Sequence, residues 1–151
     1  MKEKNNLLRI ASILMIVCAV VAIVISAVNI NSTMSGMANL GGAERAAIEA
    51  QLNENNMTMD QALTVVSGIA YVGLGFIAVF NVLKIVIGIL GLRKADTGTK
   101  FFFVWGIVFL VFGVFSLSSG IFNLLGICNL LGGIVAPILF IAGSSQNKQK
   151  I

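Results

Sequence analysis

Residues 101–147 read FFFVWGIVFLVFGVFSLSSGIFNLLGICNLLGGIVAPILFIAGSSQN, a run of 47 residues without one charged side chain. The hydrocarbon core of a membrane is about 30 Å thick, so a helix needs about 20 apolar residues to cross it. The run is therefore long enough for two crossings if a turn divides it. Residues 116–120, SLSSG, supply turn-forming residues at a suitable distance from both ends. We expect two membrane spans here, at about 101–117 and 120–143.

Two further stretches carry no charge, over 21 residues at 10–30 and over 23 residues at 61–83. The first is longer than the apolar run of about 7–15 residues in a cleaved signal peptide, so we interpret it as a retained helix. The sequence thus predicts an all-α, polytopic membrane protein: a bundle of four transmembrane helices with a short extracellular helical cap. We expect a single membrane domain over 1–151, with an outer loop at 31–69 and spans at about 8–30, 70–92, 101–117 and 120–143.

Composition narrows the class of protein further. The chain of 151 residues is 58% hydrophobic and only 11% charged, with a net charge of +4 and no histidine. Such a composition argues against a soluble enzyme, a disordered chain and a nucleic-acid-binding protein. All six carboxylates lie outside the expected spans, and no serine has a visible base. We therefore predict no enzymatic activity, no cofactor and no metal site.

The distribution of basic residues predicts the orientation in the membrane. One side would hold eight basic against two acidic residues, while the 31–69 segment holds one basic against four acidic residues. Cytoplasmic loops of membrane proteins carry the excess of lysine and arginine. We expect a multi-pass protein of the plasma membrane with both termini in the cytoplasm. The eight basic residues are Lys2, Lys4, Arg9, Arg93, Lys94, Lys100, Lys148 and Lys150.

The start of the second long helix is marked by a capping box at 58–61, TMDQ, and its end by Arg93 and Lys94. A helix of that length exceeds the thickness of the apolar layer, so its first turns would stand outside the membrane. The Ala-rich segment 43–52 is expected to form a helix that covers those turns. The cap is either a structural cover or a docking surface for an extracellular partner. The residues of this candidate partner surface are Ile48, Leu52, Leu63 and Val66.

Polar residues inside the expected spans are few and form a candidate polar site. Apart from Arg9 at the very start of the first span, Lys84 is the only charge within a span, about 13 Å from Arg93 along the helix. Its ammonium group would reach the headgroups, be solvated inside the bundle by Asn81 and Asn123, or pair with an acid of another subunit. The complete candidate site comprises Lys84, Asn81, Asn123 and Asn129.

The fourth span contains a candidate hinge at Gly132, Gly133 and Pro137. Pro137 has no backbone N–H, which leaves the Gly133 carbonyl without its helical donor and predicts a kink. The kink would act either as a gating hinge or as a static bend.

Cys18 and Cys128 both fall near mid-membrane, where a thiol behaves as a small apolar group, and no disulfide is predicted.

Two stretches, GILGLRK at 88–94 and LLGGIVAPILFIAG at 130–143, are similar to segments of small four-span proteins of Gram-positive bacteria whose function is unassigned. The order of spans also resembles the claudin and tetraspan layout, in topology only, because the outer loop lacks the Trp and paired Cys of claudins. The resemblance implies a bacterial plasma-membrane protein.

We expect a non-enzymatic integral membrane protein that acts by association, as an accessory subunit, an immunity or envelope factor, or a homo-oligomer. Its partners would be the lipid bilayer and another membrane protein or a second copy of the chain, without nucleic acid. The alternative is a small pore or anion-permeable transporter that uses Lys84 and the intramembrane asparagines.

Overall fold

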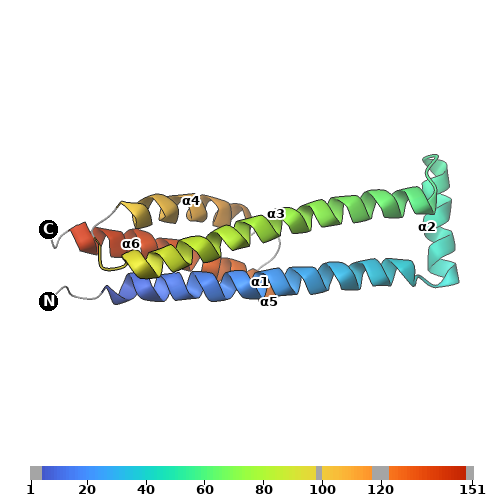
Figure 1. Cartoon of the computed structure of the whole chain (residues 1–151). Coiled ribbons are helices and arrows are strands. Elements are labelled where there is room, and N and C mark those ends of the chain that lie inside the picture. Colours follow the sequence, from blue (N-terminus) through green and yellow to red (C-terminus); the bar gives the residue numbers. More distant parts are fainter. Residues whose placement is uncertain (1–4, 98–99, 117–122, 149–151) are drawn as a thin grey trace. The chain divides into compact units, whose positions relative to one another are not determined.

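A computed structural model of the chain describes residues 5–97, 100–116 and 123–148 (Figure 1). Within these ranges the regular structure is entirely helical, with no strand, which confirms the all-α class. The elements are α1 (Asn6–Ala38), α2 (Gly42–Glu54), α3 (Met59–Lys94), α4 (Phe101–Ser116), α5 (Leu124–Leu130), the π-helical turn η2 (Leu131–Val135) and α6 (Ala136–Lys148).

Three helical segments among the described residues are long and apolar enough to cross a membrane: 6–38, 59–94 and 124–146. A fourth apolar helix, at 101–115, is shorter. These helices are compatible with a multi-pass membrane protein. α1 continues to Ala38, eight residues past the expected end of the first span at residue 30. The turn was expected at 116–120. Residues 117–122 are not among the described residues, so this turn lies outside them from residue 117 onward.

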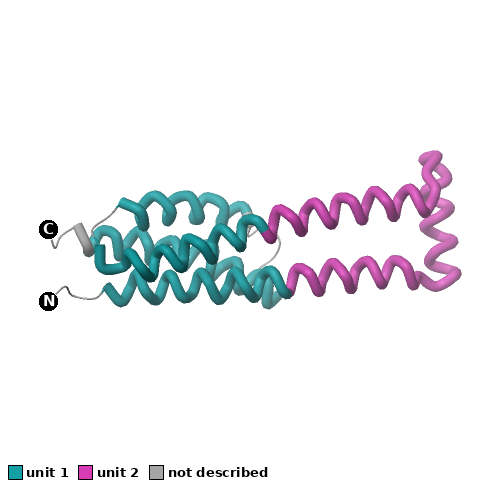
Figure 2. Tube along the Cα trace, viewed as in Figure 1, with its two compact units in different colours: residues 1–24, 79–151 teal, residues 25–78 magenta. Residues whose placement is uncertain are grey.

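The chain divides into two compact units (Figure 2). Unit 1 comprises residues 1–24 and 79–151, and unit 2 comprises residues 25–78. Unit 1 therefore contains the first part of α1, the last part of α3 and all of α4, α5, η2 and α6. Unit 2 contains the rest of α1 and α3, together with α2.

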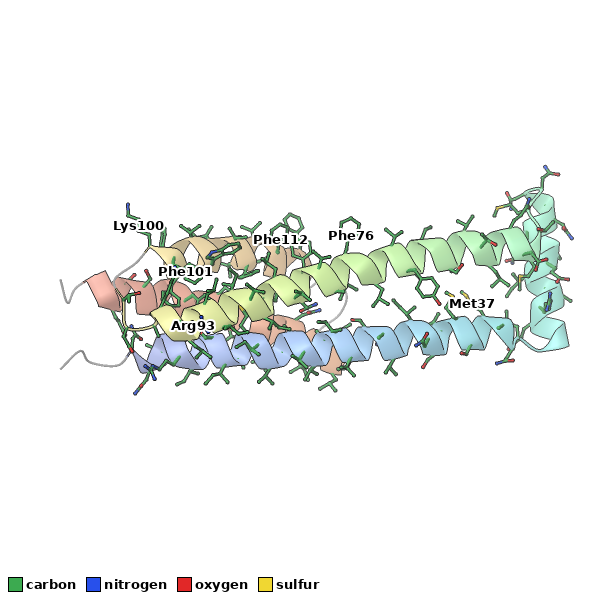
Figure 3. All side chains as sticks on the ribbon, viewed as in Figure 1. Met37, Phe76, Arg93, Lys100, Phe101 and Phe112 are labelled. Atoms are coloured by element: carbon green, nitrogen blue, oxygen red, sulfur yellow. The ribbon has the colours of Figure 1, made fainter. Side chains whose placement is uncertain are left out.

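Unit 1 is a helical bundle with an aromatic core. Phe102, Phe109 and Phe140 are completely buried, and the rings of Phe102 and Phe140 meet edge to face with centroids 5.2 Å apart. The outer surface is equally apolar: Phe112 of α4 points outward (Figure 3) and is half exposed. An apolar exterior around a packed interior suits a bundle surrounded by lipid. On α1 the exterior stripe is formed by Ile10, Ile13, Val17, Val20 and Val24.

Glycines hold the helices of unit 1 close together. A Cβ atom on Gly88 of α3 would lie 2.6 Å from Ile16 of α1, and one on Gly106 of α4 would lie 2.7 Å from Ile141 of α6. Both distances are shorter than side chains tolerate, so these positions require glycine for close packing.

Unit 2 is built around the beginning of α3. The Thr58 N–H donates to Gln61 Oε1 at 3.0 Å, and the Gln61 N–H donates to Thr58 Oγ1 at 3.3 Å. This reciprocal pair confirms the predicted capping box. Residues of α2 and the start of α3, including Arg45, Glu49 and Asp60, line an open hollow of about 260 Å³. The predicted helix over 43–52 is also confirmed, because α2 covers Gly42–Glu54.

Candidate functional site

Lys84 and Asn81 lie on one face of α3 in unit 1, because residues three apart on a helix are neighbours. Asn81 is buried and Lys84 is half-buried. A Cβ atom on Gly88, one helical turn after Lys84, would lie 2.6 Å from Ile16 of α1. The face of α3 that carries Lys84 and Gly88 therefore packs against α1 in unit 1.

The two cysteines lie on different helices of unit 1, and both are free and buried. Cys18 belongs to α1 and Cys128 to α5. A Cβ atom on Gly132, four residues after Cys128, would lie 2.7 Å from the Cβ atom of Cys18. α1 therefore packs closely against the η2 turn, a contact for which the sequence contained no signal.

The other two asparagines of the predicted polar site belong to α5 and its N-cap. Asn123 is the N-cap of α5, and its Oδ1 atom accepts a hydrogen bond of 2.7 Å from the Gly126 N–H. Asn129 is half-buried on α5. The described hydrogen bond therefore gives Asn123 a structural role, because it satisfies an N–H group at the start of a helix.

The predicted hinge is a π-helical turn. The Ala136 N–H donates to the Leu131 carbonyl, five residues back, directly before Pro137. Gly132 and Gly133 are buried in the turn. The Gly133 carbonyl lies against Gly113 of α4, in the space that a Cβ on Gly113 would occupy. The irregularity thus falls at the predicted residues, and both glycines of the turn face neighbouring helices.

A polar cluster ties the beginning of α1 to the segment after α3. The Asn5 N–H donates to Asp96 Oδ1 at 3.1 Å, and Arg9 Nη2 forms an ion pair with Asp96 Oδ2 at 2.7 Å. Asn5 Nδ2 also donates to the Gly143 carbonyl of α6 at 3.0 Å. The N-terminal end, the α3–α4 connection and α6 therefore meet at one end of unit 1. No pattern in the sequence indicated this cluster, which we name the terminal clasp: Asn5, Arg9, Asp96 and Gly143.

The predicted partner surface on α2 and α3 is only partly covered. Leu52 and Leu63 are half-buried, whereas Ile48 and Val66 are exposed. More strongly exposed apolar side chains follow on α3. Val65, Ile69 and Val72 are 52%, 69% and 62% exposed, and their spacing places them on one side of the helix. We name these three residues the apolar face of α3.

Metal-ligating residues do not cluster in the part of the chain that the structure describes: no group of three or more His, Cys, Asp or Glu residues could hold an ion there. Comparisons of the chain with protein-family models, with curated proteins and with solved structures find no match.

Proposed function

We propose that the protein is a multi-pass membrane protein that acts by associating with another membrane protein or with a second copy of itself. Both termini would face the cytoplasm, with α2 and the start of α3 outside the membrane. The excess of basic residues at the termini and the α3–α4 connection supports this orientation. The terminal clasp also supports this orientation, because it joins the beginning of α1, the segment after α3 and α6 at one end of unit 1.

The observation that carries the proposal is the apolar face of α3. Along the helix, Ile69 precedes Arg93 by 24 residues, or about 36 Å. If Arg93 lies at the inner membrane surface, Ile69 lies beyond a hydrocarbon layer of about 30 Å. Lipid tails would not cover it, and an exposed apolar face in water marks an interaction site. The apolar face of α3 would therefore be covered by a protein partner.

Loose packing in unit 2 supports the same proposal. Among its described residues only Ser26 and Met59 are buried. A Cβ on Gly68, Gly73 or Gly75 of α3 would meet nothing within 4 Å, in contrast to the glycines of unit 1. α3 therefore presents small and apolar residues that a second helix could approach closely.

The experiment is purification of the tagged protein in a mild detergent, followed by measurement of the mass of the complex. The doubly substituted chain with Val65→Ser and Ile69→Ser should lose the complex. The matched control carries Ile107→Ser and Val111→Ser on α4, which are exposed in unit 1 and should leave the complex intact. If the unsubstituted protein is monomeric, the proposal is contradicted.

The alternative function is a pore. A pore would conduct anions in proteoliposomes, and Lys84→Met would abolish that flux.

A further inference from the structure

The apolar face of α3 adjoins an open hollow at its N-terminal end. The hollow, of about 310 Å³, is lined by Asp60, Gln61, Thr64 and Val65. Val65 belongs both to the hollow and to the apolar face. Gln61, Val65 and Ile69 are spaced four residues apart, so they follow one side of the helix. A segment that covers the apolar face would therefore also reach the hollow.

Asp60 brings a negative charge to this surface. Its side chain is exposed, and it lines both this hollow and the hollow between α2 and the start of α3. Arg45 lines the second hollow, where its guanidinium group pairs with Glu49 at 3.0 Å. Among the described residues, no basic side chain forms an ion pair with Asp60. The Asp60 carboxylate is therefore open to a cation from another molecule.

The charge of unit 2 as a whole has the same sign. Residues 25–78 contain four acidic residues and one basic residue, although the complete chain carries a net charge of +4. All four acids lie on α2 or in the first turn of α3. Complementary charges around an interface steer the right partner to it and exclude partners of the wrong sign. Unit 2 therefore favours a partner whose approaching segment is basic.

The same charges disfavour a second copy of this chain on the apolar face. Two copies in one membrane would have the same orientation, and a twofold axis between them would place residues near the axis opposite their own counterparts. Asp60 of one copy would then lie close to Asp60 of the other. Like charges brought together in this way weaken association. A basic segment of another protein suits the apolar face better.

We propose that the apolar face of α3 binds a basic amphipathic helix of a different protein. The apolar side of that helix would lie on Val65, Ile69 and Val72, and one of its lysines or arginines would pair with Asp60. Gly68 lies on the same side of α3, and a Cβ there would meet nothing within 4 Å, so a helix could approach closely. This inference rests on the proposed function, because it specifies the partner that would cover the same face.

The first test uses a probe peptide and the full-length protein in nanodiscs of phosphatidylcholine, with a photo-crosslinking amino acid at position 69. The probe is a synthetic amphipathic helix of leucine and lysine, and the matched probe has glutamate in place of every lysine. The lysine probe should crosslink at a concentration about tenfold lower than the glutamate probe needs. Equal crosslinking by both probes, or crosslinking by neither, would overturn the inference.

Substitution of Asp60 separates the role of the charge from that of apolar burial. Asp60→Asn should raise the concentration of the lysine probe for half-maximal crosslinking about fivefold, equivalent to ~1 kcal/mol. Asp60→Glu should restore the original value. The matched control is Glu54→Gln, which removes a charge that lines neither hollow and should change the value by at most about twofold. Equal effects of Asp60→Asn and Glu54→Gln would overturn the pairing at Asp60.

The second test separates this inference from the proposed function. In intact cells the adduct formed at position 69 is digested, and the crosslinked segment is identified by mass spectrometry. We expect a segment of another protein with an excess of lysine and arginine. A crosslink to a second copy of this chain, or to an acidic or uncharged segment, would overturn the inference and leave the proposed function standing. Lipid adducts alone would contradict both.

Discussion

The carbonyl oxygen of Gly133 occupies the space where a Cβ atom on Gly113 would lie. This contact joins the backbones of α4 and the η2 turn without an intervening side chain. It involves the carbonyl whose usual helical donor is missing because residue 137 is proline. The close approach of the two helices and the irregular turn are therefore parts of one arrangement.

Gly113→Ala tests this contact. The new methyl group would collide with backbone that has no freedom to rotate away, so we expect the free energy of unfolding to fall by about 1–3 kcal/mol. Gly75→Ala is the matched control, because a Cβ there meets nothing within 4 Å. In the control the alanine should leave stability unchanged or raise it by up to ~1 kcal/mol through helix propensity. Unfolding by SDS in mixed micelles provides the measurement, and equal effects of the two substitutions would contradict the account.

The η2 turn should behave as a static bend rather than as a gating hinge. Gly132 faces Cys18 and Gly133 faces Gly113, so both glycines of the turn are held by neighbouring helices. We expect backbone amides at 131–135 to exchange with deuterium as slowly as those of α6. Gly113→Ala should accelerate exchange in this turn first. Rapid exchange at 131–135 in the unsubstituted protein would favour the hinge instead.

The terminal clasp should contribute modestly to stability. Asp96→Ala removes the acceptor of the Asn5 N–H and the partner of Arg9. We expect a loss of about 1 kcal/mol, at the low end for such a pair, because the side chains of Arg9 and Asp96 are 38% and 31% exposed. Glu49→Ala, which breaks the exposed Arg45–Glu49 pair, should cost at most ~0.5 kcal/mol. A loss at Asp96 no larger than that at Glu49, in the same SDS titration, would show that the clasp adds nothing.

Orientation in the membrane is testable by labelling single cysteines in a chain that carries Cys18→Ser and Cys128→Ser. In intact cells an impermeant maleimide should modify Glu49→Cys and spare Lys148→Cys. The reason is the excess of basic residues on the side of the termini. Modification of position 148 with protection of position 49 would reverse the proposed topology.

The sequence predicted most accurately where the signal is local. The start of α3 follows from Thr58 and Gln61, which are three residues apart, and Arg93 and Lys94 mark its end. The clasp was not predictable, because Asn5 and Asp96 are 91 positions apart and neither residue type is unusual where it stands. Likewise, Pro137 and the two glycines before it indicated an irregular helix, but the π-helical form depends on contacts with other helices.

The neighbours of Lys84 illustrate the same limit. Helical spacing correctly places Asn81 and Lys84 on one face of α3. No local pattern could indicate that this face of α3 packs against Ile16 of α1, because that depends on how the two helices meet. Asn123 was expected to solvate the lysine, and its described hydrogen bond is that of an N-cap. An asparagine before an apolar helix is a capping signal in its own right.

Association through the apolar face of α3 is tested most directly by a photo-crosslinking amino acid at position 69 in intact cells, compared with one at position 107. Both native isoleucines are exposed, one in unit 2 and the other in unit 1. The account predicts that position 69 yields an adduct of defined protein mass, whereas position 107 yields lipid adducts. Lipid adducts alone at both positions would contradict it.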